Sequence, residues 1–308
     1  MSSKWMIQDW TTGELNALVK NLGGEKVARK IQGGEVKVSS EDVADVAKVF
    51  FDKHGRRIPE GLQANVCDAN KDFRLDQPEL KVDASYIKRI QLLHESLGID
   101  TGITSKQLRE KCQRLRKMIA DMPQTANILK GVNLPVVLVK RYSDDIGEDL
   151  EWQLDGVERS YLETFPDRKF YNHRKSTLAG QVKVIPEVFK EGGYKSIWGK
   201  KKSEHIIALF FPNPLQGYSI FAQREQMVSL SEFGFILSGA IEPMTMYPDI
   251  LARDWDTPGL DLPALFISSW RSAGSFYFRA GRDGLVLSST ARLADALGSY
   301  SGGLLFLG

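Results

Sequence analysis

The stretch that decides the fold starts with SKQLREKCQRLRKMIA at residues 105–120 and continues to LPVVLVK at residues 134–140. In the first segment Leu108, Cys112, Leu115 and Ile119 recur every three or four residues, the spacing of one buried helix face. The second segment is a short apolar, β-branched run, which is typical of a buried strand. We therefore predict an α+β protein, with a helical N-terminal domain at residues 1–130 and a mostly antiparallel, β-rich domain at residues 131–308.

Segments farther from this boundary fit the same division. Helical spacing predicts helices at residues 25–32 and 83–97. After the boundary, β-rich runs predict strands at residues 181–185, 206–211, 218–222, 233–237, 264–268 and 275–280. Asp283-Gly284 predicts a hairpin turn, and Ser289 is placed to cap a last helix that contains Leu293 and Leu297. The apolar end at residues 303–308 predicts a tucked strand.

The composition is that of a globular protein, with 42% hydrophobic and 26% charged residues in 308. The two cysteines, Cys67 and Cys112, exclude a disulfide scaffold and indicate free thiols in a reducing compartment. The N-terminus has no apolar core of signal-peptide length, and the longest apolar runs are shorter than a membrane span. We therefore expect a cytoplasmic protein without a membrane partner.

Charge is nearly balanced in total, at a net +2, but it is sorted along the chain. An acidic block at residues 144–167 contains Asp144, Asp145, Glu148, Asp149, Glu151, Asp155, Glu158, Glu163 and Asp167. A basic block at residues 168–202 contains Arg168, Lys169, Arg174, Lys175, Lys183, Lys190, Lys195, Lys200, Lys201 and Lys202. Opposite blocks attract each other within one chain or between copies, where a head-to-tail contact builds oligomers. Charges that only keep the protein soluble explain the same pattern and are the alternative. The two blocks together form a charged insertion at about residues 144–202 of the β-rich domain.

The helix predicted at residues 105–120 is strongly basic and carries one acid, Glu110. Such a face releases counterions from a phosphate backbone, so nucleic-acid binding is the alternative function. No aromatic residues interleave with the basic ones, and a solvated helix face explains the same pattern. The residues of this alternative site are Lys106, Arg109, Lys111, Arg114, Arg116 and Lys117.

Residues 68–79, DANKDFRLDQPE, come nearest to a metal-binding motif. Their oxygen ligands have the spacing of a calcium loop, in which several oxygens converge on one hard cation. However, Phe73 stands where the sharp turn needs Gly, so a polar turn with Phe73 and Leu75 in the core is favoured and no cofactor is expected. If Ca²⁺ binds, its ligands are Asp68, Asn70, Asp72, Asp76 and Glu79.

The C-terminal part is rich in aromatic residues. Trp255, Trp270 and Tyr277 are candidates for anchors at an interface, where such residues concentrate binding energy. Packing in the core of a sheet accounts for the same residues and is the alternative.

Several stretches resemble an uncharacterised family of short bacterial proteins of the candidate-phylum type. They are LVKNLGGE at residues 18–25, GEVKV at 34–38, IPEG at 58–61, KQLR at 106–109, and DWDTP at 254–258 followed by PA at 263–264. The resemblance implies a compact helical N-terminal part joined to a Trp-containing β part. It implies no catalytic residues, because no activity is assigned to that family.

No local pattern in the sequence indicates catalysis. A P-loop, a nucleophile elbow, a dinucleotide fingerprint and paired metal-binding histidines are all missing from the sequence. A non-enzymatic interaction or structural protein, able to self-associate through charge and an aromatic β surface, is therefore the leading hypothesis. Nucleic-acid binding is the alternative, and an enzyme of unrecognised type is the second alternative, since catalytic groups assemble in space rather than in sequence.

Overall fold

The computed structural model describes residues 19, 24–35, 49–59, 66–67, 72–80, 82–185, 193–267 and 274–308. The chain divides into two compact units, Met1–Phe50 and Phe51–Gly308. In the first unit, helix α2 (Glu25–Gln32) has the predicted bounds, and Arg29 Nη2 lies 2.5 Å from Glu25 Oε1 one turn away.

Two helices with the predicted bounds open the well-packed part of the second unit. Helix α4 (Asp83–Leu97) ends at Gly98, whose φ of 65° is the left-handed conformation that stops many helices. Helix α5 (Ser105–Ala120) begins with a capping box between Thr104 and Gln107. Its apolar face is fully buried, as its periodicity predicts, and α5 packs against strands of the first sheet.

The first sheet has four antiparallel strands in the order β1-β4-β10-β5. These are β1 (Leu134–Leu138), β4 (Ile206–Phe211), β10 (Leu304–Phe306) and β5 (Phe235–Leu237). The C-terminal strand β10 lies between β4 and β5, which confirms the predicted tucked strand. Almost every residue of the four strands is buried, because α5 covers β1 and β4 on one side and α10 (Glu242–Met246) contacts β1.

The second sheet has six strands and is mostly antiparallel. Its order is β2-β8-β7-β6-β3, and β9 pairs with β6. The strands are β2 (Lys169–Asn172), β3 (Val182–Val184), β6 (Gly259–Ile267), β7 (Gly274–Ala280), β8 (Gly284–Thr290) and β9 (Tyr300–Gly302). The pairs β2–β8 and β6–β9 are parallel, and the predicted Asp283-Gly284 turn joins β7 to β8.

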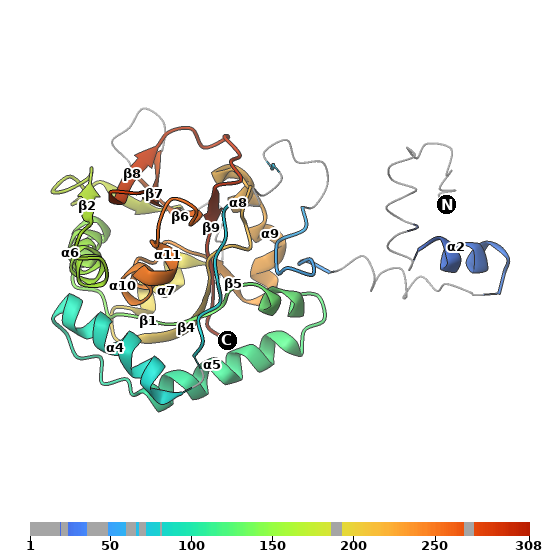
Figure 1. Cartoon of the computed structure of the whole chain (residues 1–308), viewed down its shortest axis with the longest axis horizontal. Coiled ribbons are helices and arrows are strands. Elements are labelled where there is room, and N and C mark those ends of the chain that lie inside the picture. The colour runs from blue at the N-terminus through green and yellow to red at the C-terminus, as the bar shows by residue number, and fades with distance from the viewer. Residues whose placement is uncertain are drawn as a thin grey trace. The chain divides into compact units, whose positions relative to one another are not determined.

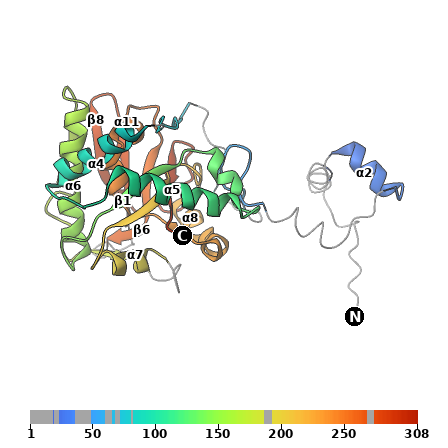
Figure 2. The same ribbon diagram turned by 90° about the horizontal axis from the view of Figure 1, so that it is seen from below.

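Helices connect and cover the two sheets. In Figure 1, α4 and α5 run below β1 and β4, and α10 and α11 (Pro248–Leu251) lie between these strands and β6, β7 and β8. Figure 2 shows α4 and α5 in front of the strands. Helix α6 (Ile146–Thr164) packs against α4 and α10. The shorter helices are η2 (Ala126–Lys130), α7 (Tyr194–Lys200), α8 (Ile220–Glu225), α9 (Met227–Leu230) and η3 (Ser231–Phe233).

The α+β class is confirmed, with helices concentrated in the earlier part of the chain and strands in the later part. The strand predicted at residues 218–222 is wrong, because the Ser219 side chain caps α8 by accepting from Ala222 N at 3.2 Å. The helix predicted after Ser289 is also wrong, since Ser289 belongs to β8 and turns follow it. Residues on both sides of the boundary predicted near 130 belong to the second unit, and the expected insertion contains α6, part of its core.

Candidate interaction site

The basic residues predicted to bind nucleic acid divide among several environments on α5. Arg109 forms an ion pair with Asp83 of α4. Arg116 Nε donates to Asn133 Oδ1 at 2.8 Å. These two guanidinium groups therefore tie α5 to its neighbours inside the protein.

The other members face solvent or a hollow. Lys106 and Lys117 are exposed. Lys111 and Arg114 line a hollow of about 440 Å³ together with Lys200 at the end of α7 and with two acids, Glu110 and Glu204. Three basic side chains from two separate helices thus gather at one place, which the sequence alone did not indicate.

The predicted calcium loop is described only in part. Asp76 Oδ2 lies 3.1 Å from Arg253 Nη1, so an internal cation neutralises this carboxylate. Phe73 and Leu75 are half-buried, in line with the polar-turn interpretation. In the described ranges, no group of three or more His, Cys, Asp or Glu side chains could hold a metal. Asp72 and Glu79 are exposed, whereas Asp68 and Asn70 lie outside the described residues, so the loop geometry stays a prediction.

The aromatic candidates occupy different settings. Trp255 is 62% exposed in the loop that follows α11. Tyr277 is half-buried on β7, and its ring meets that of Tyr300 edge to face at 5.5 Å. Trp270 lies outside the described residues.

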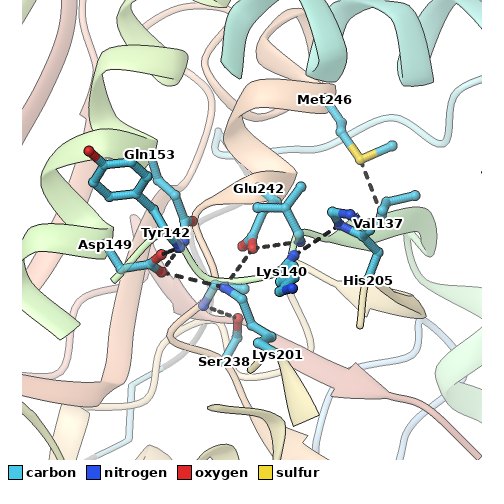
Figure 3. A network of polar contacts seen from close by, with 12 residues as sticks. Val137, Lys140, Tyr142, Asp149, Gln153, Lys201, His205, Ser238, Glu242 and Met246 are labelled. Carbon is cyan, nitrogen blue, oxygen red and sulfur yellow. Dashed lines mark hydrogen bonds and ion pairs between the residues drawn. The ribbon is translucent and has the colours of Figure 1, made fainter. Parts of the chain in front are cut away.

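The acidic and basic blocks meet at one buried cluster, shown in Figure 3. Lys201 Nζ lies 2.8 Å from Glu242 Oε1 and 3.7 Å from Asp149 Oδ2. All three side chains are only 1% exposed. Among the described residues, Lys201–Asp149 is the one ion pair that joins the two blocks.

Helix ends bring the three charges together. Asp149 lies in the first turn of α6 and Glu242 is the first residue of α10, where the helix dipole stabilises an anion. Lys201 is the C-cap of α7, where the dipole stabilises a cation. Each ionised group therefore lies at the helix terminus of opposite partial charge.

Backbone groups after β1 complete the cluster (Figure 3). Val139 N donates to Glu242 Oε1 at 3.1 Å, and Tyr142 N donates to Asp149 Oδ1 at 2.5 Å. Gln153 Nε2 donates to Asp149 Oδ2 at 2.7 Å from the next turn of α6. The segment between β1 and α6 is thereby held against both carboxylates.

Lys201 supplies the one positive charge among the three charged side chains of the cluster, so the two buried carboxyl groups depend on it. Burial raises the pKa of Asp149, although the Lys201 ammonium acts to lower it. Burial also raises the pKa of the nearby Tyr194 well above its usual range, and the charges of Glu242 and Asp149 add to that effect. Within the described part of the chain, Glu242 Oε2 has no hydrogen-bond partner. One ammonium thus serves two buried carboxyl groups.

A substrate has no access to this cluster, because its charged side chains are almost fully enclosed. The arrangement therefore anchors α6, α7 and α10 to the segment after β1. Glu242 was not among the predicted residues, although one signal in the sequence pointed to it. It is a single charge within the otherwise uncharged run FILSGAIEPMTMY at residues 235–247.

Most of the other described charges of each block are exposed, whereas Asp145, Glu151, Glu158, Arg168 and Arg174 are half-buried. Asp144, whose side chain is 82% exposed, pairs with Arg141 outside the blocks. Other exposed acids lie along or just after α6, and exposed lysines occur on β2, β3 and α7. The exposed members are Glu148, Asp155, Glu163 and Asp167 in the acidic block, and Lys169, Lys175, Lys183, Lys195, Lys200 and Lys202 in the basic block.

Comparison of the chain with family models, with curated proteins and with solved structures found no significant match. The resemblance noted from the sequence therefore stays a prediction, and function is argued from the site. In the described ranges no helix has the length and apolar character needed to cross a membrane.

Proposed function

We propose that this protein is a non-enzymatic interaction protein that associates with copies of itself through the acidic block and the basic block. The observation that carries the proposal is the division within each block. Asp149 and Lys201 are used in the buried anchor, whereas most of the other described charges, among them Asp155, Glu163 and six lysines, remain exposed. An exposed acidic helix on one copy and an exposed lysine-rich surface on another form a heterologous contact.

The buried anchor supports this proposal because it fixes the positions of both surfaces. Asp149 belongs to α6, which carries Asp155 and Glu163 on its exposed side. Lys201 directly follows α7, which carries Lys195 and Lys200. Rigid, complementary surfaces steer association and set its register more than they raise affinity. The exposed Trp255 is a candidate for the aromatic anchor that adds affinity.

Sedimentation velocity of the full chain tests the proposal. The screening length falls from about 30 Å at about 0.01 M salt to about 3 Å at about 1 M salt. We expect oligomers at the low salt concentration that dissociate at the high one. A monomer at both concentrations, over a wide range of protein concentration, would remove the proposal.

Nucleic-acid binding is the second candidate, and the hollow favours it because its three cations, Lys111, Arg114 and Lys200, outnumber its two acids, Glu110 and Glu204. A phosphate backbone lying in this hollow would meet cations from two helices. Bound nucleic acid after purification at low salt, with affinity that falls linearly on a logarithmic salt scale, would support this candidate. Both proposals place the protein in the cytoplasm.

A further inference from the structure

A separate cavity of about 290 Å³ lies against the second sheet. Asp261 of β6 and Tyr277 of β7 are register partners, so their side chains point to the same face. Tyr300 of β9 lines the same cavity, with its ring at 85° to the Tyr277 ring. A carboxyl group and two aromatic rings therefore line one open cavity.

Asp261 is buried, with 5% of the residue exposed. Its Oδ2 accepts from Gln223 Nε2 at 2.8 Å. The same nitrogen donates to Tyr218 O at 3.0 Å, which fixes the orientation of the carboxamide. No group in the described ranges donates a hydrogen bond to Asp261 Oδ1, and no Lys, Arg or His there forms an ion pair with it. This oxygen is the natural contact for a ligand that donates hydrogen bonds.

The charge and the aromatic residues of the cavity together indicate the class of ligand that it would bind. A buried carboxylate without an ion-pair partner is unfavourable, and a bound cation removes that cost. Tyrosine rings attract cations through their faces. Arg292 and Asp295 also line the cavity, but they are exposed and opposite in sign, so they give no preference for an anion.

We propose that this cavity binds a protonated amine, with the ammonium group beside Asp261 and the alkyl stem against Tyr277 and Tyr300. The volume suits a short alkylammonium group, which a free amine or a lysine side chain of a polypeptide supplies. This site is independent of the charge blocks, and its failure would leave the proposed self-association untouched.

Binding of this kind depends on pH in a defined direction. Burial raises the pKa of Asp261 to about 7, and the Gln223 hydrogen bond and the Arg224 charge offset part of that rise. The ionised fraction of a carboxyl with that pKa rises about tenfold from about pH 6 to about pH 8, while an alkylammonium stays protonated. We therefore expect about tenfold tighter binding at the higher pH. The other charged or titratable groups around this carboxyl are Tyr277 and Arg279 of β7, Tyr300 of β9, and Arg292 and Asp295 of the following loop.

Calorimetric titration of the full chain tests the proposal with three probes of similar shape. These are n-butylammonium, the anion butyrate and the neutral 1-butanol. We expect measurable binding of n-butylammonium alone. Asp261→Asn should abolish this binding, whereas Asp283→Asn, an exposed carboxylate in the β7–β8 turn, should leave it unchanged. Tyr277→Leu should weaken it severalfold.

Equal binding of the three probes would overturn the proposal, as would retained affinity in a folded Asp261→Asn variant. If that variant does not fold, the wild-type pH profile and Tyr277→Leu decide, and tighter binding at about pH 6 than at about pH 8 contradicts the charge assignment. A blocked lysine tripeptide identifies the source of the amine. Tighter binding of the peptide than of n-butylammonium indicates a polypeptide lysine, and weaker binding indicates a small amine.

Discussion

Gly302 leaves the space that the Gln223 carboxamide occupies, since a Cβ atom at position 302 would lie 2.1 Å from Gln223 Oε1. Gln223 is fully buried and donates to Asp261, so the missing side chain on β9 allows the hydrogen bond that orients the cavity carboxyl group. Gly302, which has no side chain, thus allows the geometry of the proposed amine site.

Gly302→Ala should therefore displace Gln223 and destabilise the protein by about 1–3 kcal/mol, as overpacking of a tight core does. Urea denaturation measures this change. The matched control is Gly199→Ala, because a Cβ atom at position 199 of α7 meets nothing within 4 Å. That control should be neutral or stabilised by up to about 1 kcal/mol. Equal unfolding midpoints for Gly302→Ala and the wild type would contradict the packing argument.

Lys201→Met should be among the most damaging single substitutions in the described part of the second unit. It leaves the buried carboxyl groups of Asp149 and Glu242 without their cation, a loss of about 3–5 kcal/mol. The neighbouring Lys200 is exposed, so Lys200→Met is the control and should stay within about 0.5 kcal/mol of the wild type. Similar denaturation curves for the two variants would show that the cluster is not an anchor.

Asp261→Asn should change the pH dependence of stability. The folded-state pKa of about 7 exceeds the ordinary value of 3.8, so the folded state binds this proton more tightly than the unfolded state does. The wild type should therefore lose stability as pH rises from about 4 to about 7, by about 4 kcal/mol for a shift of about three pKa units. Asp261→Asn should lack this loss and be the more stable protein at about pH 8. Parallel curves for both proteins, measured by urea denaturation across this range, would exclude the assignment.

Reversing the charge of the basic side chains in the hollow beside α5 separates the two proposed functions. Lys111→Glu together with Arg114→Glu should abolish nucleic-acid retention if the hollow binds phosphate, while self-association stays unchanged. The control is Lys106→Glu with Lys117→Glu, which changes the same net charge on the exposed part of α5. Equal loss of retention in both double variants would indicate nonspecific attraction rather than a site.

Local patterns predicted much of the fold. The bounds of α4, α5 and β4 agree with the expected segments because each has a strong period or a continuous apolar run. Prediction failed at residues 218–222, where the side chain of Ser219 caps a helix within an apolar, β-rich segment. It also missed α6, whose acidic sequence indicated an insertion, whereas Leu150, Leu154 and Val157 form a buried face.

The sites were harder to predict than the fold. Asp149, Lys201 and Glu242 lie far apart in the chain, and only the packing of three helix ends brings them together. Asp261 and Glu242 share one usable signal, since each is a single acid within an apolar run. A charge in such a run is buried by its neighbours, so it needs a partner or shifts its pKa. No local sequence pattern predicts the strand register that places Tyr277 opposite Asp261.

The most direct test of the central claim is a mixing experiment followed by sedimentation velocity at low salt. One variant carries Asp155→Lys and Glu163→Lys, and the other carries Lys195→Glu and Lys202→Glu. Each variant alone should be monomeric, because its two blocks then repel their counterparts on another copy. An equal mixture should associate, and salt should reverse that association. A wild type that stays monomeric at low salt, together with a mixture that does not associate, would contradict self-association through these surfaces.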